Sequence, residues 1–581
     1  MSYGNLNLVS NSAYTNAQKV INGETLGMGA CIVKYYEQKQ IIHYPGERST
    51  EEIKHIYPFS HRFITEAITL PNMRQLYRWN LAMFIDAQTG SGKTTFVFEV
   101  CYPIVRERGQ KLLILSNRKM IKNKIKYDAI KAACPEMLEL KTAKGIEQEH
   151  HFADIDVYTY QDFFGDFNYH LNRKEFEDSL KDYGMVIFDE IHFAVSDAGF
   201  NPYTFEIMEY LFFHIMGKEV PRVYMTGTPE FVFDYVYHQE CRYSQKNWWR
   251  QEYGNGLSHF YYCNFQRDYT YLDVISFEND AEIIKLINES KEKWVIFLND
   301  IEKAEQMESM IIERSTVVLS SGGMKIDSNK AIVESIVEKD SMGNLDVLFT
   351  TTVLDVGINI KDQVNIVSYL KERSSFIQAI GRKRVRKKEK VRLFLPQYSA
   401  QDIRKWIYQN EKELEMLREN ESKFEPETKL DGIIMPDHFY ARKGCIKSNR
   451  LSFTYYQSVL DDWKETLRNL DDKPDKIASN IIFAHFLSWL GKPMKEEVEE
   501  SKRELVAIIE KYRCQNMEED EFKSLCEELK PYDKRKDTRK SREQLSVQSV
   551  NKILEDCGLV IDHDHKAKKY KIVERREKNN G

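Results

Sequence analysis

The stretch DAQTGSGKTT at residues 86–95 constrains the fold of this chain more than any other feature. The apolar run LAMFI at 81–85, which has the length of a strand, precedes it. The stretch TTFVFEVCYPIVRE that follows has the apolar spacing of a helix packed on a sheet. In a strand–loop–helix unit of this kind, backbone N–H groups and the helix N-terminus hold phosphates. The sequence therefore predicts an α/β fold with parallel strands and a phosphate site at the end of one strand.

The residues of this loop have distinct expected roles. Gly90 and Gly92 let the backbone turn its N–H groups toward the phosphates. Lys93 is expected to reach the β and γ phosphates, and the Thr94 hydroxyl to bind Mg²⁺. The other positions expected to line the nucleotide are Ala87, Gln88, Thr89, Ser91 and Thr95. The first glycine of the common G-x-x-x-x-G-K-[ST] pattern is Ala87 in this chain.

A second stretch, YGMVIFDEIHF at 183–193, ends an apolar strand in two acids. Charged groups at the carboxyl end of a parallel strand lie at the crevice where such sheets bind ligands. A strand end with a helix cap would explain Asp189 alone, but not two adjacent acids followed by His192. We assign Asp189 to Mg²⁺, through water, and Glu190 to the attacking water. This assignment predicts hydrolysis of the nucleotide.

Length and composition limit the class of protein. The 581 residues predict about three or four domains. The net charge of −6 indicates no general affinity for nucleic acid, but two basic runs, at 382–392 and 534–542, could contact phosphates or could form a solvated charged face. The nine cysteines lack metal-ligand spacing, no apolar run reaches the roughly 20 residues of a membrane span, and the start has no signal peptide. We therefore expect a cytoplasmic protein with no membrane partner.

Lys93 and the DEIH acids resemble the first two motifs of the superfamily 2 helicases, whose phosphate loop is commonly A-x-T-G-x-G-K-T. Ala87 is then the residue that the family carries. Seven further stretches resemble the family's motifs in the family's order: LLILSNRKM (112–120), VYTYQDFF (157–164), YMTGTPE (224–230), WVIFLND (294–300), VVLSSG (317–322), FTTTVLDVGINIKD (349–362) and SSFIQAIGRKRVR (374–386). The resemblance covers roughly residues 60–395. It implies two tandem RecA-like parallel-sheet domains, ATP held between them, and a nucleic-acid strand that crosses both.

The resemblance implies two further sets of site residues, one that contacts nucleic acid and one that couples the nucleotide's state to the rest of the motor. The residues expected to contact nucleic acid are Ser116, Asn117, Arg118, Thr159, Tyr160 and Thr351. Several lie near the ends of apparent parallel strands, where hydroxyl groups can contact sugar–phosphate oxygens without reading bases, although each could instead cap the following helix. The residues expected to couple the nucleotide's state to the rest of the motor are His192, Thr226, Gly227 and Thr228. The loop around Gly227 could also be only a turn.

The second RecA-like domain is expected to complete the nucleotide site. The resemblance implies that Asp355 and Gly357 sense the nucleotide, that Gln378 contacts it, and that Arg382 is an arginine finger. Because none of these residues lies on the domain that carries Lys93, hydrolysis is expected to require closure of the two domains.

The end of the last motif departs from the common Q-x-x-G-R-x-x-R pattern, because Val385 occupies the position of the second arginine. Arg384 and Arg386 flank it. We expect Arg386 to assist Arg382, since the two are four residues apart and would share a face if a helix begins there. Both flanking arginines could instead contact only solvent or nucleic-acid phosphate.

We expect five parts along the chain: a small β element at 1–60, RecA-like domains at 61–258 and 259–398, a helix-rich accessory region at 399–540, and a basic, winged-helix-like tail at 541–581. The mixture of basic and aromatic residues at 441–457 suits a single-stranded nucleic-acid site, but we favour a small β-hairpin packed on the motor. In the tail we expect a capped helix, a stop at Gly558, and two strands around DHDHKAKK. His563 and His565 with Asp562 and Asp564 could form a metal site, but alternation in a hairpin tip places like residues on one face exposed to water, so we favour a solvated turn.

The leading hypothesis is an ATP-dependent, Mg²⁺-requiring helicase or translocase that acts on nucleic acid, with DNA favoured over RNA. The preference for DNA rests on the resemblance of 349–362 and of the TGTP loop to DNA-translocating members, and on the absence of a DEAD-type element ahead of the phosphate loop. Replication, recombination, repair and defence remain open, and the Lys-, Ile-, Asn- and Tyr-rich composition suits a bacterium, phage or mobile element. The alternatives are a restriction or defence ATPase subunit that moves on duplex DNA without unwinding it, and an ATP-binding scaffold with incidental hydrolysis.

Overall fold

The computed structural model describes residues 40–42, 51–53, 55–78, 81–117, 119–140, 143–170, 180–199, 201, 203–217, 220–229, 232–244, 260–319, 332, 336, 339–351, 359–386, 388–423, 439–442, 445–468, 470, 475–492, 505–513, 515–530, 545–554, 559–564 and 569–574. The chain forms two compact units. Unit 1 comprises Met1–Asp273, Ser290–Arg392 and Leu414–Ser458, and unit 2 comprises Val274–Glu289, Leu393–Glu413 and Val459–Gly581.

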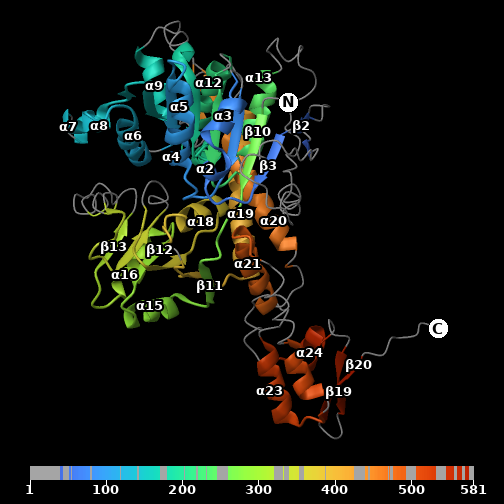
Figure 1. Ribbon diagram of the computed structural model, residues 1–581. Helices are drawn as coiled ribbons and strands as arrows, with labels where there is room; N and C mark the ends of the chain where they lie inside the picture. Colours follow the sequence, from blue (N-terminus) through green and yellow to red (C-terminus); the bar gives the residue numbers. More distant parts are fainter. Residues whose placement is uncertain are drawn as a thin grey trace. The chain divides into compact units, whose positions relative to one another are not determined.

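Two mainly parallel sheets of the RecA-like type lie between residues 55 and 396, as the sequence predicts (Figure 1). The first has eight strands, in the order β3 (His55–Phe59), β10 (Phe260–Phe265), β4 (Ala82–Asp86), β9 (Arg222–Thr226), β8 (Tyr183–Asp189), β5 (Lys111–Ser116), β7 (Ile155–Thr159) and β6 (His151–Phe152). Neighbouring strands pair in parallel except β6, which pairs with β7 in the antiparallel sense. The phosphate loop follows β4, and the two acids end and follow β8.

The strands of this sheet alternate their side chains between two apolar cores, because successive residues of a strand point to opposite faces. Ala82 and Phe84 belong to one core, whereas Met83 and Ile85 belong to the other. Helices α12 (Thr204–Gly217) and α13 (Phe233–Ser244) supply the first core, and α3 (Leu70–Leu76), α5 (Tyr102–Arg106) and α6 (Lys119–Ala133) supply the second. Burial on both faces explains why β4 and β8 read as nearly continuous apolar runs.

The ends of the first predicted domain differ from the structure. β3 lies before the expected start at 61, yet it pairs with β10 in the eight-stranded sheet. β10 lies after the expected end at 258, yet it pairs in parallel with β4, from Phe260 opposite Ala82 to Asn264 opposite Asp86. The sheet therefore continues to Phe265. Of the expected β element at 1–60, β1 (Gln40–Ile42) and β2 (Glu51–Ile53) form an antiparallel pair.

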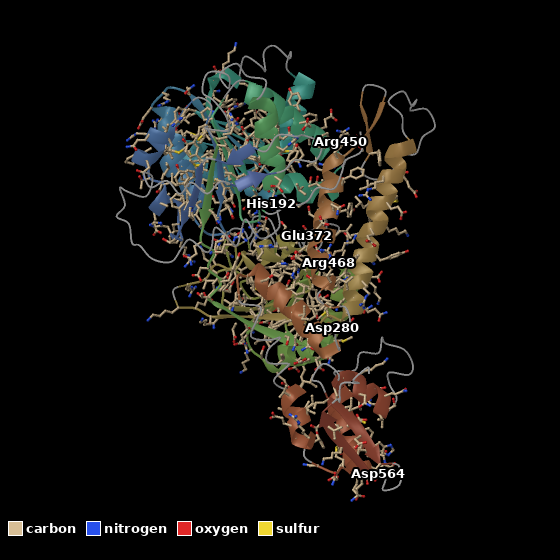
Figure 2. All side chains as sticks on the ribbon, turned by 90° about the vertical axis from the view of Figure 1, so that its right-hand side faces the viewer. His192, Asp280, Glu372, Arg450, Arg468 and Asp564 are labelled. Carbon is tan, nitrogen blue, oxygen red and sulfur yellow. The ribbon has the colours of Figure 1, made fainter. Side chains whose placement is uncertain are left out.

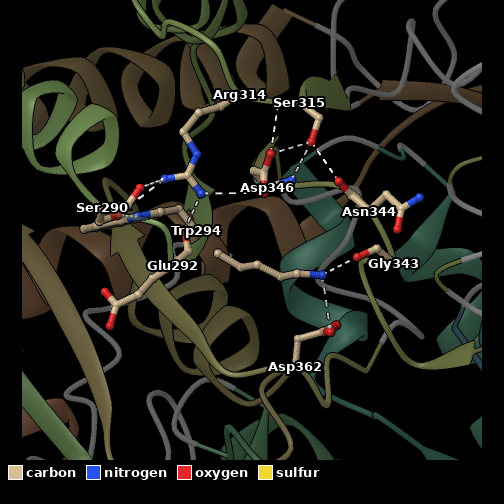
Figure 3. Close-up of polar contacts among 10 residues, drawn as sticks. Ser290, Glu292, Trp294, Arg314, Ser315, Gly343, Asn344, Asp346 and Asp362 are labelled. Carbon is tan, nitrogen blue, oxygen red and sulfur yellow. Dashed lines mark hydrogen bonds and ion pairs between the residues drawn. The ribbon is translucent and has the colours of Figure 1, made fainter.

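The second sheet has six strands, in the order β11 (Leu272–Phe277), β16 (Val391–Pro396), β15 (Val364–Ser368), β12 (Lys293–Phe297), β14 (Val347–Thr350) and β13 (Thr316–Leu319). Polar side chains fix the starts of four of its strands (Figure 3). Arg314 lies 3.7 Å from Asp346, and the Ser315 hydroxyl donates to the same carboxylate at 2.8 Å. Lys293 lies 3.5 Å from Asp362. These contacts join the start of β13 to that of β14, and the start of β12 to that of β15, at the edge opposite the strand ends from which the motifs emerge.

The predicted helix-rich region is confirmed by three long helices: α19 (Ala400–Lys423), α20 (Arg450–Arg468) and α21 (Asp475–Trp489). The predicted hairpin is confirmed as β17 (Phe439–Arg442) paired antiparallel with β18 (Cys445–Ser448). The hairpin starts two residues before the expected stretch, and α20 takes over its second half. None of the described helices combines the length and apolar character that a membrane span requires.

The tail has the expected helix and two strands: α24 (Val547–Leu554), β19 (Leu559–Asp564) and β20 (Lys569–Glu574), with the strands antiparallel. Its connection to the preceding region differs from the expected boundary at 541. Tyr570 exchanges main-chain hydrogen bonds with Met517, at 2.8 and 2.9 Å, and its ring stacks on Phe522 of α23 (Glu519–Leu529) at 4.1 Å. The other face of Tyr570 meets His563 at 4.2 Å. Within the described ranges no group of three or more Cys, His, Asp or Glu is arranged to hold a metal; Gly558 and His565 lie outside them.

Candidate functional site

The phosphate loop turns sharply between the end of β4 and the start of α4 (Lys93–Phe96). Gly90 and Gly92 have φ angles of +89° and +81°, in the left-handed region that side-chain-bearing residues rarely adopt. The main-chain N–H of Phe96 donates to the carbonyl of Gly92 at 2.9 Å, which begins the helix. The Lys93 ammonium reaches back over the loop and donates to the carbonyl of Ala87 at 3.3 Å. The loop thus curls around the lysine as its sequence predicts.

The two acids of β8 meet this lysine. Lys93 Nζ lies 3.2 Å from Glu190 Oε1, and both side chains are buried. Although burial acts to raise it, the Lys93 ammonium and the contact with His192 hold the pKa of Glu190 below its usual range. Burial and the adjacent charge of Glu190 raise the pKa of Asp189. The pKa values of two adjacent carboxylates are therefore shifted in opposite directions within one buried site.

The backbone at Glu190 is unusual, since its φ of +49° is in the left-handed region. Two main-chain hydrogen bonds hold the turn, from Ile191 to the carbonyl of Met225 at 3.1 Å and from Phe193 to the carbonyl of Glu190 at 3.0 Å. Strained backbone of this kind is found where a side chain must be aimed. Here the turn directs the Glu190 carboxylate at Lys93.

A line of polar contacts leads from the acids to the loop after β9. His192 Nδ1 lies 3.4 Å from Glu190 Oε2 and 3.1 Å from the Thr226 hydroxyl oxygen. That oxygen accepts the main-chain N–H of Thr228 at 3.0 Å. Gly227, between them, lies against the phosphate loop, where a Cβ atom would be 3.4 Å from the carbonyl of Ala87. The residues expected to couple the nucleotide's state are thus adjacent to both the loop and the acids.

The second sheet brings α18 (Arg373–Ile380) to this site. Arg382, two residues after the helix, is buried, and its Nη2 donates to Gln378 Oε1 at 3.2 Å. Its charge acts to lower the pKa of both acids. Gly381 touches the phosphate loop so closely that a Cβ atom would lie 2.7 Å from Thr89 Cβ. Within unit 1, residues of the second sheet therefore face the loop of the first.

The order expected for the two flanking arginines is reversed by the geometry. Arg384 lies over the phosphate loop, where a Cβ atom on Gly90 would meet its Nη1 at 2.6 Å, and its Nε donates to Asn359 at 2.6 Å. Arg386 is exposed and lines a basic hollow with Lys361, Gln363, Lys388, Glu389 and Lys390. The expectation failed because α18 ends at Ile380, so helical spacing does not apply to residues 382–386.

The buried polar atoms around the loop that have no hydrogen-bond partner in the described part of the chain include four from hydroxyl, amide and guanidinium groups: Thr89 Oγ1, Ser91 Oγ, Gln378 Nε2 and Arg384 Nη1. Buried polar groups in proteins are nearly always hydrogen-bonded. All four groups can donate, and all surround a glycine loop at a helix N-terminus. This donor set fits the phosphate oxygens of a nucleotide. The hydroxyl-bearing Thr94 and Thr95 are exposed at the start of α4.

The residues expected to contact nucleic acid divide into two groups. Ser116 ends β5 and Asn117 follows it, and their buried oxygens, Ser116 Oγ and Asn117 Oδ1, lack partners among the described residues. Thr159 and Tyr160 instead have structural roles. The Thr159 hydroxyl accepts the main-chain N–H of Asp162 at 2.9 Å, which caps the helix α9 (Tyr160–His170). Tyr160 is fully buried, and its hydroxyl donates to the carbonyl of Asp189 at 2.9 Å.

Tyr160 is therefore a core residue that supports the acids, and the expectation of a nucleic-acid contact is corrected for it. The capping alternative holds for Thr159. Thr351 follows β14 and is half-buried. Three expected site residues, Arg118, Asp355 and Gly357, lie outside the described residues.

Sequence reasoning missed a set of residues that holds the base of the phosphate loop. The fully buried carboxylate of Asp86 accepts Arg267 Nη2 and the Tyr262 hydroxyl, both at 3.0 Å. The main-chain N–H of Asp268 donates to Gln88 Oε1 at 2.8 Å. The available signal was Asp86 itself, because a carboxylate that ends a buried strand needs a cationic partner. Tyr262 lies in β10, and Arg267 and Asp268 follow it; this strand was assigned to the other domain.

Two family models match the sequence. Residues 55–231 match the family described as type III restriction enzyme, res subunit, and residues 278–385 match the helicase conserved C-terminal domain. No curated protein matches the sequence.

Several solved structures are similar to the chain. Dbp5 of S. cerevisiae, bound to RNA and ADP BeF3, is 15% identical with a TM-score of 0.35, over 54% of this chain and 79% of that one. A DEAD box protein from Methanococcus jannaschii is 16% identical with a TM-score of 0.30, over 54% and 82%. The DUF1998 helicase MrfA bound to DNA is 12% identical with a TM-score of 0.39, over 66% and 60%.

Proposed function

We propose that this chain, which belongs to the superfamily 2 helicases, is a Mg²⁺-dependent ATPase that moves along nucleic acid, with DNA as the favoured substrate. The observation that carries the proposal is the meeting of Lys93 with Glu190 at 3.2 Å beside a loop that Arg382 and Arg384 approach from the second sheet. Opposed basic and acidic groups around a glycine loop suit transfer of a phosphoryl group to water.

Each side chain then has a defined task in hydrolysis. Lys93 and Arg384 would hold phosphate oxygens, and Arg382 would stabilise charge that develops on the transferred phosphoryl group. Glu190, whose pKa is lowered, would accept a hydrogen bond from the attacking water and orient it.

The residues around the loop also fit a magnesium ion. Thr94 and Asp189 would hold it, together with phosphate oxygens and water, since Mg²⁺ binds through one or two carboxylates and substrate phosphates. The ion would supply neutralising charge on the phosphates when bound.

The proposed nucleic-acid contact begins at the end of β5. The unpartnered oxygens of Ser116 and Asn117 support it, because side chains of this type bind sugar and phosphate without reading sequence. The preference for DNA rests on the resemblance of residues 349–362 and of the TGTP loop to DNA-translocating members.

A second candidate is a translocase that moves on duplex DNA without separating the strands. The match of residues 55–231 to the res subunit of type III restriction enzymes favours it. A strand-displacement assay on forked and blunt duplexes distinguishes the two, since only a helicase releases the displaced strand.

The test is steady-state ATP hydrolysis with single-stranded DNA, duplex DNA and RNA, each with Mg²⁺ and with EDTA. We expect strong stimulation by DNA, weaker stimulation by RNA, and loss of activity in EDTA. An ATPase that no nucleic acid stimulates would indicate the scaffold alternative. Greater stimulation by RNA than by DNA would reverse the substrate preference.

A further inference from the structure

The first turns of α20 are tied to the first sheet's domain just after the acids. Asn449, immediately before the helix, donates through Nδ2 to the carbonyl of Asn201 at 2.8 Å. The Ser452 hydroxyl donates to the carbonyl of Ala198 at 2.7 Å. Both side chains are fully buried, and Leu451 between them belongs to the apolar core of the first sheet. The start of α20, marked by Arg450 in Figure 2, is therefore anchored next to the segment that carries the acids.

One turn further along, α20 reaches the other domain of the motor. The ring of Tyr455 packs against the same apolar core, and its hydroxyl donates to Glu372 Oε2 at 3.2 Å. The Ser375 hydroxyl donates to the same oxygen at 3.3 Å. Burial raises the pKa of Glu372 to about 6, while the two hydroxyl groups act in the opposite direction. At about pH 8 the group is a carboxylate, and a hydrogen bond to it is charge-assisted.

Glu372 is the residue from which α18 starts, since the main-chain N–H of Phe376 donates to its carbonyl at 2.9 Å. The next residues of α18 also meet the first domain, because the Ser374 hydroxyl donates to the Thr228 hydroxyl oxygen at 3.1 Å. The helix is short and carries Gln378 and, just past its end, Arg382. A helix of this length is about 12 Å long and moves as a rigid rod, so fixing its start fixes its far end.

We propose that residues 449–455 form a strap that joins the segment after the acids to the start of α18, and that Tyr455 is a positioning residue for Arg382. The strap acts through Glu372 and touches no nucleotide. The second of the two family models ends at residue 385, so residues 449–455 lie beyond both. The strap explains why these residues are nevertheless packed against the domains of both sheets in unit 1. The inference rests on the proposed ATPase, since the arginine that the strap positions is assigned by that proposal.

The test is the steady-state ATPase of the full-length chain at about pH 8, with saturating DNA, for Tyr455→Phe, Glu372→Ala and the double variant. Tyr456→Phe is the matched control, because it removes the same group from the next residue of the same helix. We expect Tyr455→Phe to lower kcat about three- to tenfold, the effect of one lost hydrogen bond on a barrier, with KM for ATP unchanged. Glu372→Ala should reproduce this fall, and the double variant should be no worse than the more impaired single variant.

The outcomes separate the strap from the ATPase on which it rests. If the parent chain shows no DNA-stimulated turnover, the proposed function fails first. If the parent is stimulated and Tyr455→Phe has the parent's kcat, the strap is refuted while the ATPase stands. A rise in KM without a fall in kcat, additive losses in the double variant, or an equal loss in Tyr456→Phe would also refute it. Thermal unfolding of each variant is measured alongside, and Glu372→Ala decides the matter if Tyr455→Phe does not fold.

Discussion

Arg384 and Arg386 are two residues apart in the sequence, yet only Arg384 approaches the phosphate loop. We expect Arg384→Ala to lower nucleic-acid-stimulated ATP turnover at least about tenfold, because a charge on the phosphate oxygens is lost. Arg386→Ala should retain turnover within about twofold and reduce the salt dependence of nucleic-acid binding, as loss of a basic phosphate contact does. Turnover and binding titrations at several salt concentrations measure both effects. A greater loss of turnover for Arg386→Ala would restore the order expected from the sequence.

Lys126 is fully buried and donates to the carbonyl of Glu147 at 2.7 Å. Burial, together with the charge of Lys122, lowers its pKa from 10.5 to about 8. Between these values the unfolded chain binds more protons than the folded chain, so this group makes the free energy of unfolding rise with pH. We predict that the difference in free energy of unfolding between the parent and Lys126→Met grows in favour of the parent across that window and is constant below it. Urea unfolding at a series of pH values measures the difference, and one that stays constant would show an unshifted pKa.

At the scale of secondary-structure elements, the sequence predicts the motif strands well, because each is a buried apolar run that ends in polar or small residues. The strand β4 and the acids after β8 follow from such patterns alone. β3 and β10 were assigned to the wrong side of a boundary, since nothing local in HIYPF or FYYCNF shows that the two strands pair across about 200 residues. The end of α18 and the capping role of Thr159 also depend on neighbours that a single sequence does not reveal.

The contact between α18 and the phosphate loop requires a glycine at 381. In Gly381→Ala the new Cβ would lie 2.7 Å from Thr89 Cβ and 3.2 Å from the carbonyl of Ile377, so one of the two elements must move. We expect stimulated turnover to fall about ten- to a hundredfold, because small displacements of catalytic groups are costly. Gly165→Ala is the matched control, since a Cβ there meets nothing within 4 Å. Equal turnover in both variants would mean that the two elements do not come together during hydrolysis.

At the scale of the whole molecule, the tail packs against the helical segment that precedes it in the sequence. The pairing of Tyr570 with Met517 and its stacking on Phe522 place residues 515–530 and 545–574 in one module. A truncation at 541 would therefore expose an apolar face on α23, and a cut after Lys492 is the cleaner design.

We expect the chain truncated after Lys492 to keep its basal ATPase, because no residue of the candidate site lies beyond that point. Its affinity for nucleic acid should fall, with a smaller salt slope, since the basic stretches at 534–542 and 566–571 would no longer release counterions. Fluorescence anisotropy at several salt concentrations measures both quantities. Equal affinity and equal salt slope would reduce the module to a structural role.

The proposed ATPase requires both sheets to act on one nucleotide, and Arg382 tests this requirement most directly. The measurement is DNA-stimulated ATP turnover of Arg382→Ala beside its affinity for nucleotide, with Glu190→Gln as the reference for lost chemistry. We predict that Arg382→Ala loses roughly a thousandfold or more in turnover, as expected for an arginine that stabilises phosphoryl transfer, while nucleotide binding stays nearly as in the parent. Full activity in Arg382→Ala would contradict catalysis by two domains, because the second sheet would then contribute no essential charge to the reaction.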